Sequence, residues 1–505
     1  MSAGVTGAAI TAAAPLESDA RRSLRNAFTL GASLVLTWSV GIGIKLLLPR
    51  YLGPSLFGAY QFADAFTVTL FIVTGFGLET YIRKEVSTRP EHASDFFGGT
   101  LALRFALGIP LVGGALLALL HAGKPPVVQH LVLWLGGYQF LLMTNLTLAA
   151  ILQSVGTVNG LAVLNVASKV LTGVGIIVGF EIGAGVESIG AAFLLAELCR
   201  SVGLWVLSRR HTGLNARLHV RSTIAVFVAS IPFYLSDIAQ TAYAKINVTI
   251  MAFLTTNIEV GWYGAASNLA GLSLLLTPLI VWVLDPMTSR AVQRSDAQLR
   301  MVVCRAMELI LTGAIPVTLL LALGADVIVP LVFGPAFVPA TDSLRIIAPV
   351  FVLTYMAIVG SSTLVRLERP WPVTWLSAAG LVISPVLSVV LIPRSLAALG
   401  PGGAGVGAAA ALVITEALIT LITVYLVREY VFDRRSLVRL GKMLVVSGVV
   451  VALDRALVSL GGVRLLADAL VYVGGVIAWR AVDIREIFNF VRGALRRGDT
   501  DARVA

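Results

Sequence analysis

The chain has 505 residues, of which 57% are apolar and only 13% are charged, a charge density about half that of soluble globular proteins. Its mean hydropathy is +0.89, and apolar runs of roughly twenty residues, each long enough to cross a hydrocarbon layer about 30 Å thick, follow one another almost to the end. These features exclude a soluble protein and predict an all-α polytopic membrane protein. A membrane β-barrel would instead need short strands of alternating polarity.

About fourteen apolar runs are predicted to span the membrane as helices. In chain order they cover approximately residues 26–49, 57–80, 98–121, 127–153, 159–180, 187–208, 222–254, 260–286, 303–323, 341–365, 373–393, 405–427, 440–460 and 463–480. No loop between them exceeds about twenty residues. The chain therefore has no room for a soluble catalytic domain, and we expect it not to be an enzyme.

Basic residues concentrate in the N-terminal tail and in every second loop. The opposite loops contain only Arg50, Lys124, Arg394 and Arg464. Because cytoplasmic loops carry the excess of Lys and Arg, both termini are predicted to lie in the cytoplasm, with the chain in the cytoplasmic membrane. The net charge of +11 follows this topology, so we expect no nucleic-acid partner.

Metal chemistry has little support in the sequence. The two cysteines, Cys199 and Cys304, fall in or beside different apolar runs, and the five histidines lie in loops or at helix ends. None of these residues has the spacing of metal ligands on a buried helix. We therefore expect no cofactor, apart from a coupling ion such as H⁺ or Na⁺.

Several short motifs occur twice in the same order. "FGAYQFADAF" (57–66) opens the second run and "VGWYGAASNLAGL" (260–272) opens the eighth, and both place Gly-x-Tyr at the start of a helix. "GAGV" precedes the sixth run at 183–186 and the twelfth at 403–406. Runs one to six and seven to twelve are therefore predicted to be two copies of one unit, related by an axis along the membrane normal.

The repeat predicts the organisation of the chain. We expect a cytoplasmic tail (1–25), an N-lobe (26–208), a cytoplasmic inter-lobe linker (209–221), a C-lobe (222–427), an appendix of two spans (428–480) and a second cytoplasmic tail (481–505).

Three segments resemble those of the polysaccharide (Wzx-type) flippases: "LGPSLFGAY" (52–60), "GFGLETYIRKEV" (75–86) and "LVFGPAFVPA" (331–340). That family belongs to the MOP superfamily, which also holds the MATE drug exporters and the lipid II flippases. The resemblance covers about residues 25–480 and implies a MATE-like fold of two lobes around a cationic cavity. It also implies that the protein moves undecaprenyl-diphosphate-linked sugars across the membrane by alternating access, with the last two spans holding the lipid tail. The cavity arginines of the lipid II flippases have no counterparts at matching places here.

Basic residues inside or beside the runs are the first candidates for contacts with such a cargo. A charged side chain at the centre of a bilayer costs roughly 2.5–3.5 kcal/mol, so it persists where it has a role. Lys45 and Lys245 lie at similar distances before an aromatic-Leu pair that occurs in both copies, at 51–52 and 253–254. The repeat therefore predicts that the two lysines face each other and hold one diphosphate. Alternatively, each extends to the outer headgroups. Lys169 deep in the fifth run, and Arg83 with Lys84 at the cytoplasmic mouth, are further candidates, although topology alone also explains the last two.

Two acids, Asp64 and Asp237, are the candidates for ion coupling. A carboxylate at this depth could bind a proton or sodium ion, or neutralise a nearby lysine while the site is empty. The polar residues of the second and seventh runs indicate helices that line a cavity, with interhelix hydrogen bonds as the alternative; they include Gln61, Tyr234, Gln240 and Asn247.

The remaining charges within the runs are interpreted as structural. Glu197 and Arg200 are spaced for an i,i+3 pair on one helix. Arg104 is close enough to a helix end for its guanidinium to reach the interface. Asp454 is expected to be interfacial.

Two other transport functions remain open. A MATE-type antiporter of organic cations would need a cavity dominated by acids, whereas the lysines suit an anionic cargo. A lipid II flippase differs only in its cargo. The expected partners are the lipid-linked glycan, membrane lipids, and a polysaccharide polymerase with glycosyltransferases, and the chain is expected to act as a monomer.

Overall fold

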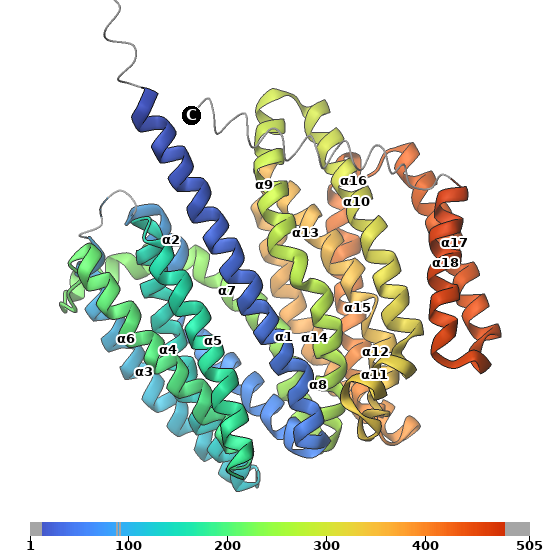
Figure 1. The fold of residues 1–505 in the computed structure, drawn as a ribbon, viewed down its shortest axis with the longest axis horizontal. Coiled ribbons are helices and arrows are strands. Elements are labelled where there is room, and N and C mark those ends of the chain that lie inside the picture. The colour runs from blue at the N-terminus through green and yellow to red at the C-terminus, as the bar shows by residue number, and fades with distance from the viewer. Residues whose placement is uncertain (1–12, 87–88, 90–91, 480–505) are drawn as a thin grey trace, which may run out of the picture.

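A computed structural model describes residues 13–86, 89 and 92–479. All regular elements in this range are helical (Figure 1), which confirms the all-α prediction. In chain order they are α1 (Ala13–Phe71), η1 (Ile72–Thr74), α2 (Leu78–Glu85), α3 (Ala93–His121), α4 (Pro126–Ser154), α5 (Val158–Glu181), α6 (Glu187–Thr212), α7 (Val220–Leu254), α8 (Asn257–Leu272), η3 (Ser273–Leu276), α9 (Thr277–Arg294), α10 (Asp296–Leu323), α11 (Ala325–Phe333), η4 (Pro335–Phe337), α12 (Ala340–Ile347), α13 (Val350–Arg366), α14 (Pro370–Leu399), α15 (Gly403–Leu426), α16 (Arg428–Val431), α17 (Arg434–Ala456), η5 (Val458–Val463) and α18 (Arg464–Ala478).

Eleven segments of the described residues are long and apolar enough to cross a membrane. The predicted number of about fourteen is therefore not confirmed. Two of the differences arise where helices bend or break: α1 counts once, and η3 separates α8 from α9. The third concerns α7, a continuous helix whose described side chains form only the short apolar pieces Val220–Ile231 and Lys245–Leu254.

The bend in α1 shows why two predicted spans became one element. Gly53 has φ 68° and ψ 172°, a left-handed backbone conformation that glycine adopts without steric cost. Pro49 and Pro54 flank it, and each lacks the N–H that a continuous helix would use. The chain therefore turns back at Gly53 and sends residues 54–71 down the other side of the turn.

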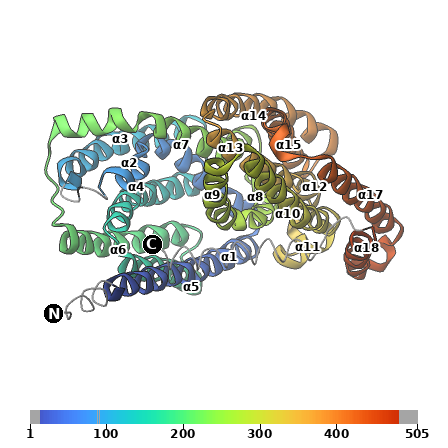
Figure 2. The same ribbon diagram turned by 90° about the horizontal axis from the view of Figure 1, so that it is seen from above.

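The helices form two groups on either side of α1. Figure 1 shows α2–α6 on one side of α1 and α9–α15 on the other, while α17 and α18 form the far edge. Figure 2 shows from above that α17 and α18 lie at the end of the bundle opposite α2–α6. α1 packs against α4 and α5 and also against α7 and α8, so it joins the groups. We call the end of the bundle that contains Gly53 the Gly53 end, and the opposite end, which contains the connection 213–219, the linker end. The boundaries of the lobes stay a prediction.

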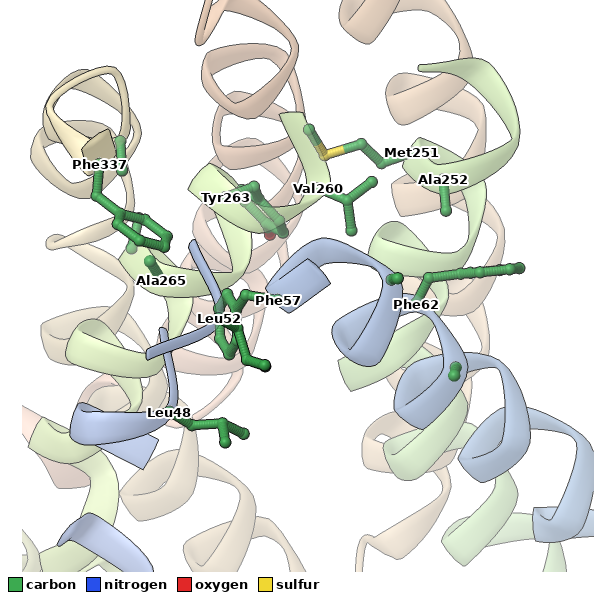
Figure 3. Packing of buried hydrophobic residues seen from close by; sticks show 14 of the residues in the cluster. Leu48, Leu52, Phe57, Phe62, Met251, Ala252, Val260, Tyr263, Ala265 and Phe337 are labelled. Atoms are coloured by element: carbon green, nitrogen blue, oxygen red, sulfur yellow. The ribbon is translucent and has the colours of Figure 1, made fainter. Parts of the chain in front are cut away.

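The Gly53 end contains the largest hydrophobic cluster. It combines Phe57 and Phe62 of α1 with Met251 of α7 and Tyr263 of α8 (Figure 3), all at most 2% exposed. Phe57 also lies edge-on to Phe337, with their ring centroids 6.2 Å apart. Apolar side chains from distant parts of the sequence thus close this end of the bundle.

The two Gly-x-Tyr motifs pack against each other in this cluster. A Cβ atom on Gly58 would lie 1.7 Å from the carbonyl oxygen of Asn257, and one on Gly261 would lie 2.0 Å from that of Pro54. Real Cβ atoms do not approach a backbone oxygen so closely, so each motif needs glycine for the α1–α8 crossing. The repeated motifs therefore form the contact between the two copies, which we call the glycine seam.

The appendix, α17 and α18, is attached to the rest of the bundle by polar contacts near both ends. Near the linker end, Glu308 of α10 accepts hydrogen bonds from Ser436 at 2.6 Å and Arg439 at 3.0 Å. At the Gly53 end, Arg464 contacts Asp454 at 2.7 Å and Asp326 at 2.6 Å. These contacts hold both helices of the appendix to α10 and α11.

The structure gives two single charges buried partners that the sequence did not predict. Asp454, expected to be interfacial, lies in the last turn of α17 and is 6% exposed, because it pairs with the buried Arg464. Arg104 is 2% exposed and does not reach the interface: its Nε donates to the carbonyl oxygen of Thr74 at 3.0 Å. That carbonyl is freed where η1 interrupts the helix, and a break of this kind is not visible as a hydropathy signal.

Candidate anion site at half depth

Three lysines lie at comparable depth in the bundle. With a rise of about 1.5 Å per residue, Lys45 is about 12 Å from the Gly53 turn, Lys245 about 14 Å from the end of α7, and Lys169 about 18 Å from the end of α5. All three helices end at the Gly53 end. The similar depth that the repeat predicted for Lys45 and Lys245 agrees with this geometry, and Lys169 joins them.

Lys245 forms an ion pair with Asp64. Its ammonium nitrogen donates to Asp64 Oδ2 at 2.8 Å, and the side chains of Lys245 and Asp64 are 38% and 21% exposed. The pair joins α7 to α1, so a lysine of the predicted C-lobe is neutralised by an acid of the predicted N-lobe. The side chain of Asp237, the other candidate acid, lies outside the described residues.

Lys45 and Lys169 have no direct ion pair or hydrogen bond with any described residue. Lys45 is exposed and interacts electrostatically with both Lys245 and Asp64. Lys169 is partly exposed and interacts electrostatically with Lys45 and Glu197. The two ammonium groups are therefore available to an anion, although both come from the predicted N-lobe rather than from opposite lobes.

Glu197 is the centre of a buried polar network behind Lys169. It is 3% exposed and accepts hydrogen bonds from Arg200 at 2.6 Å and from Asn145 Nδ2 at 2.9 Å. Arg200 also donates to Asn165 at 2.8 Å. The predicted structural pair is confirmed, and the network adds two asparagines that the sequence analysis missed. In the sequence, the only sign of these two residues as network members was that each places a polar amide inside an apolar run.

The other predicted site residues occupy different surroundings. Gln61 packs against Gly264 in the α1–α8 contact, and the Tyr234 hydroxyl donates to the carbonyl oxygen of Val73 at 2.7 Å. Asn247 is 3% exposed and accepts hydrogen bonds from two serines of α14, Ser384 at 2.9 Å and Ser388 at 3.1 Å. Asn247 thus fits the interhelix alternative. The side chains of Arg83, Lys84 and Gln240 lie outside the described residues.

The charges of this region favour a dianion. Lys45, Lys169 and Lys245 contribute three positive charges and Asp64 one negative charge, while Glu197 and Arg200 cancel. Among the described side chains the region therefore has two uncompensated positive charges in a low-dielectric setting, where an anion is held more strongly than in water. We refer to Lys45, Asp64, Lys169 and Lys245 as the charge belt.

Comparisons with known proteins identify the family of this chain and its fold. A family model described as "Polysaccharide biosynthesis protein" matches residues 23–292. The probable low-salt glycan biosynthesis flippase Agl15 of Haloferax volcanii is 24% identical over 258 residues, which are 49% of this chain and 51% of that protein. The match thus spans about half the length of this curated relative.

Two solved structures have the same fold. A structure of the lipid II flippase MurJ in an inward closed conformation matches with a TM-score of 0.68 and 15% identity, covering 90% of this chain and 99% of that one. An inward-facing multidrug resistance MATE family transporter of the MOP superfamily matches with a TM-score of 0.60 and 17% identity, covering 76% and 97%. The expected MATE-like architecture is therefore confirmed.

Proposed function

We propose, from the premise that this chain belongs to the polysaccharide biosynthesis protein family, that it is a flippase for lipid-linked oligosaccharides. Its cargo would be undecaprenyl-diphosphate-linked repeat units, which it would move across the cytoplasmic membrane by alternating access. The name of the H. volcanii relative, a glycan biosynthesis flippase, supports a glycan cargo. Transport of this kind requires no catalytic group.

The charge belt is the observation that carries the proposal. A diphosphate that links a lipid to a sugar has two negative charges, and its passage through the hydrocarbon region requires counter-charges along the route. Charge-assisted hydrogen bonds from ammonium groups to phosphate oxygens supply them. The two free lysines, Lys45 and Lys169, match the cargo in number and sign.

The distribution of basic residues assigns the two ends of the bundle. The loops of the linker end carry the excess of Lys and Arg, so this end and both termini would face the cytoplasm. The Gly53 end, closed by the glycine seam and its hydrophobic cluster, would face outwards. Cargo would then reach the charge belt from the cytoplasmic side, and Asp64 is the described acid that could bind a coupling H⁺ or Na⁺.

The same charges separate this proposal from the alternatives. An organic cation, the cargo of a drug exporter, would be repelled by two uncompensated positive charges. A lipid II flippase would use the same diphosphate contacts, because its cargo has the same linkage. Function in two tester strains, one without its polysaccharide flippase and one without its lipid II flippase, separates these two cargoes.

Complementation of the polysaccharide flippase-null strain tests the proposal. The parent chain should restore surface glycan. Lys45→Ala and Lys169→Ala should each reduce restoration about 10- to 100-fold, as expected when a hydrogen bond to a charged group worth about 1.5–3 kcal/mol is lost. Arg394→Ala removes an exposed cation at the Gly53 end and should have no effect. A fully active, normally expressed Lys45→Ala/Lys169→Ala chain would refute the proposal.

A further inference from the structure

We propose that the Asp64–Lys245 ion pair is a strut between the two halves of the bundle, and that an anion held by Lys45 and Lys169 releases it. The pair thus has a role before cargo binds: it keeps the Gly53 end closed while the charge belt is empty. This inference rests on the proposed function, because the anion in question is the diphosphate of the cargo.

The position of the pair indicates the role of a strut. Asp64 lies in the part of α1 that follows the glycine seam, and Lys245 lies on α7, whose last residues contribute Met251 to the hydrophobic cluster. The 2.8 Å contact therefore joins α1 to α7 on the interior side of the closed end. Separation of α1 from α7 and α8 at the Gly53 end would have to break it.

The surroundings of the pair make it sensitive to an anion. Lys45 interacts electrostatically with both members of the pair, and Lys169 interacts with Lys45. An anion bound by these two lysines therefore lies within the electrostatic reach of Lys245 and Asp64. It attracts the ammonium group of Lys245 and repels the carboxylate of Asp64, so both effects weaken the same contact.

Release of the strut would couple anion binding at the charge belt to opening of the Gly53 end. A ligand shifts an equilibrium only through a difference in its affinity for the two states. Here the anion gains a third ammonium group, Lys245, only after Asp64 has left it. The occupied protein thus favours the state without the strut, whereas the empty protein stays closed and does not cycle without cargo.

Thiol labelling of the full-length protein measures closure directly. The exposed Cys199 is replaced by Ser, and Ala59→Cys places a reporter beside the glycine seam at a position that is 2% exposed. A charged maleimide should label this cysteine slowly. Asp64→Asn and Lys245→Met should each raise the rate about tenfold, because either change removes the strut.

Matched controls separate the strut from a general loss of charge. Lys45→Met and Lys169→Met remove the same charge at similar depth without touching the pair, and labelling should stay slow. The exchanged pair Asp64→Lys/Lys245→Asp should restore slow labelling, which a purely local role for either side chain would not do. An Asp64→Asn chain that labels no faster than the parent would overturn the inference.

Sodium diphosphate tests the release. Added at millimolar concentration, it should accelerate labelling of the parent chain several-fold, and the acceleration should vanish in the Lys45→Met/Lys169→Met chain. Unchanged labelling of the parent would overturn the release step. Complementation is scored separately: a chain that shows the strut and its release but restores no flippase-null strain would contradict the proposed function and leave the strut standing.

Discussion

The two halves of the bundle share a backbone pattern and differ in their charges. In each half the helical segment that contains Gly-x-Tyr is followed by a short 3₁₀ helix, η1 or η3. At each break a carbonyl accepts a hydrogen bond from a tyrosine hydroxyl of the predicted C-lobe. Tyr234 donates to Val73 at 2.7 Å, and Tyr355 donates to Ser273 at 3.1 Å. Hydrogen-bond donors are needed wherever a helix breaks inside a membrane. The breaks occur in both halves, whereas the tyrosines that satisfy them both come from the second half.

The charges are only partly repeated. The first half places Lys45 and Lys169 at half depth without an ion-pair partner among the described residues, whereas Lys245 of the second half is paired with Asp64 and lies beside the neutral cluster of Asn247 with two serines. The second half also uses Glu308 and Asp326 to attach the appendix. The two halves thus share a backbone pattern and differ in their polar side chains, which fits the general rule that function resides in sites added to folds.

Arg464→Ala should give the largest effect on stability. It removes the buried partner of Asp454 and Asp326 and leaves a buried carboxylate unpaired, which costs roughly 3–5 kcal/mol. Thermal unfolding in detergent should show a clear loss of stability for this variant. Arg455→Ala should show no loss, because the side chain of Arg455 is exposed. Equal stability of the two variants would show that the appendix does not depend on this contact.

Gly58→Ala and Gly261→Ala test the glycine seam, to which each half contributes one Gly-x-Tyr motif. Each added Cβ would meet a backbone oxygen, and overpacking of this kind costs typically about 1–3 kcal/mol. Both should speed maleimide labelling of an Ala266→Cys reporter by similar factors. Gly113→Ala has open space around its Cβ and serves as the control. A large effect from only one seam glycine would contradict a symmetric contact.

Asp433→Ala tests the attachment of the appendix near the linker end. Asp433 caps α17 by accepting a hydrogen bond from the Ser436 N–H at 2.6 Å, and this bond lowers the pKa of Asp433. Because the carboxylate is the stabilised form, its contribution should be present above its ordinary pKa and should disappear as the pH falls through the lowered value. Loss of such a cap costs about 1 kcal/mol.

Thermal unfolding of Asp433→Ala at pH 7 and at about pH 3 measures this contribution. The loss of stability relative to the parent chain should be present at pH 7 and should be smaller at the lower pH. Asp433→Asn keeps a capping side chain that does not titrate, so it should remain close to the parent at pH 7. A deficit of Asp433→Ala that did not change with pH would contradict the role of the carboxylate.

Replacement of Lys124 should give the smallest effect, a change in how closure of the Gly53 end depends on pH. In the loop between α3 and α4, its amine donates to the carbonyl of Ala252 and lies 5.5 Å from the ring centroids of Phe62 and Phe253. Burial in this contact lowers the pKa of Lys124. The closed state thus binds the proton less tightly than an open state in which the amine is hydrated, so a rise in pH should favour closure.

Labelling of the Ala59→Cys reporter, divided by that of an exposed Ser55→Cys chain to cancel thiol ionisation, measures this dependence. The ratio should fall about twofold between pH 7 and pH 9, because only part of the Lys124 population titrates below its ordinary pKa of about 10.4. Lys124→Met should flatten the change. A slope that Lys124→Met leaves unchanged would mean that another group controls it.

Much of the fold was predictable because the bilayer imposes simple rules. Long apolar runs, alternating basic loops and repeated Gly-x-Tyr motifs predicted a helical membrane protein, the resemblance predicted its MATE-like shape, and the structure confirmed both. The number of spans was less accessible, since hydropathy does not reveal whether a helix bends, as at Gly53, or breaks, as at η3.

The sequence selected the candidate residues, whose role in the site stays a prediction, but it did not predict their pairing. The cost of a charge inside a membrane singled out Lys45, Asp64, Lys169 and Lys245 from the sequence alone. The repeat then paired Lys45 with Lys245, whereas the structure pairs Lys245 with Asp64, 181 residues away. A salt bridge depends on which helix faces lie opposite each other, and such faces are set by packing between distant segments.

The amino-acid sequence by itself determined where this chain can be buried in lipid, because apolar length and the positions of Lys and Arg act locally along the chain. Only the tertiary structure decided that the two glycine motifs meet each other, that Asp64 neutralises Lys245, and that Arg464 is buried between two acids. Each of those contacts depends on distances of a few ångströms between helices, and such distances exist only after the whole bundle has packed.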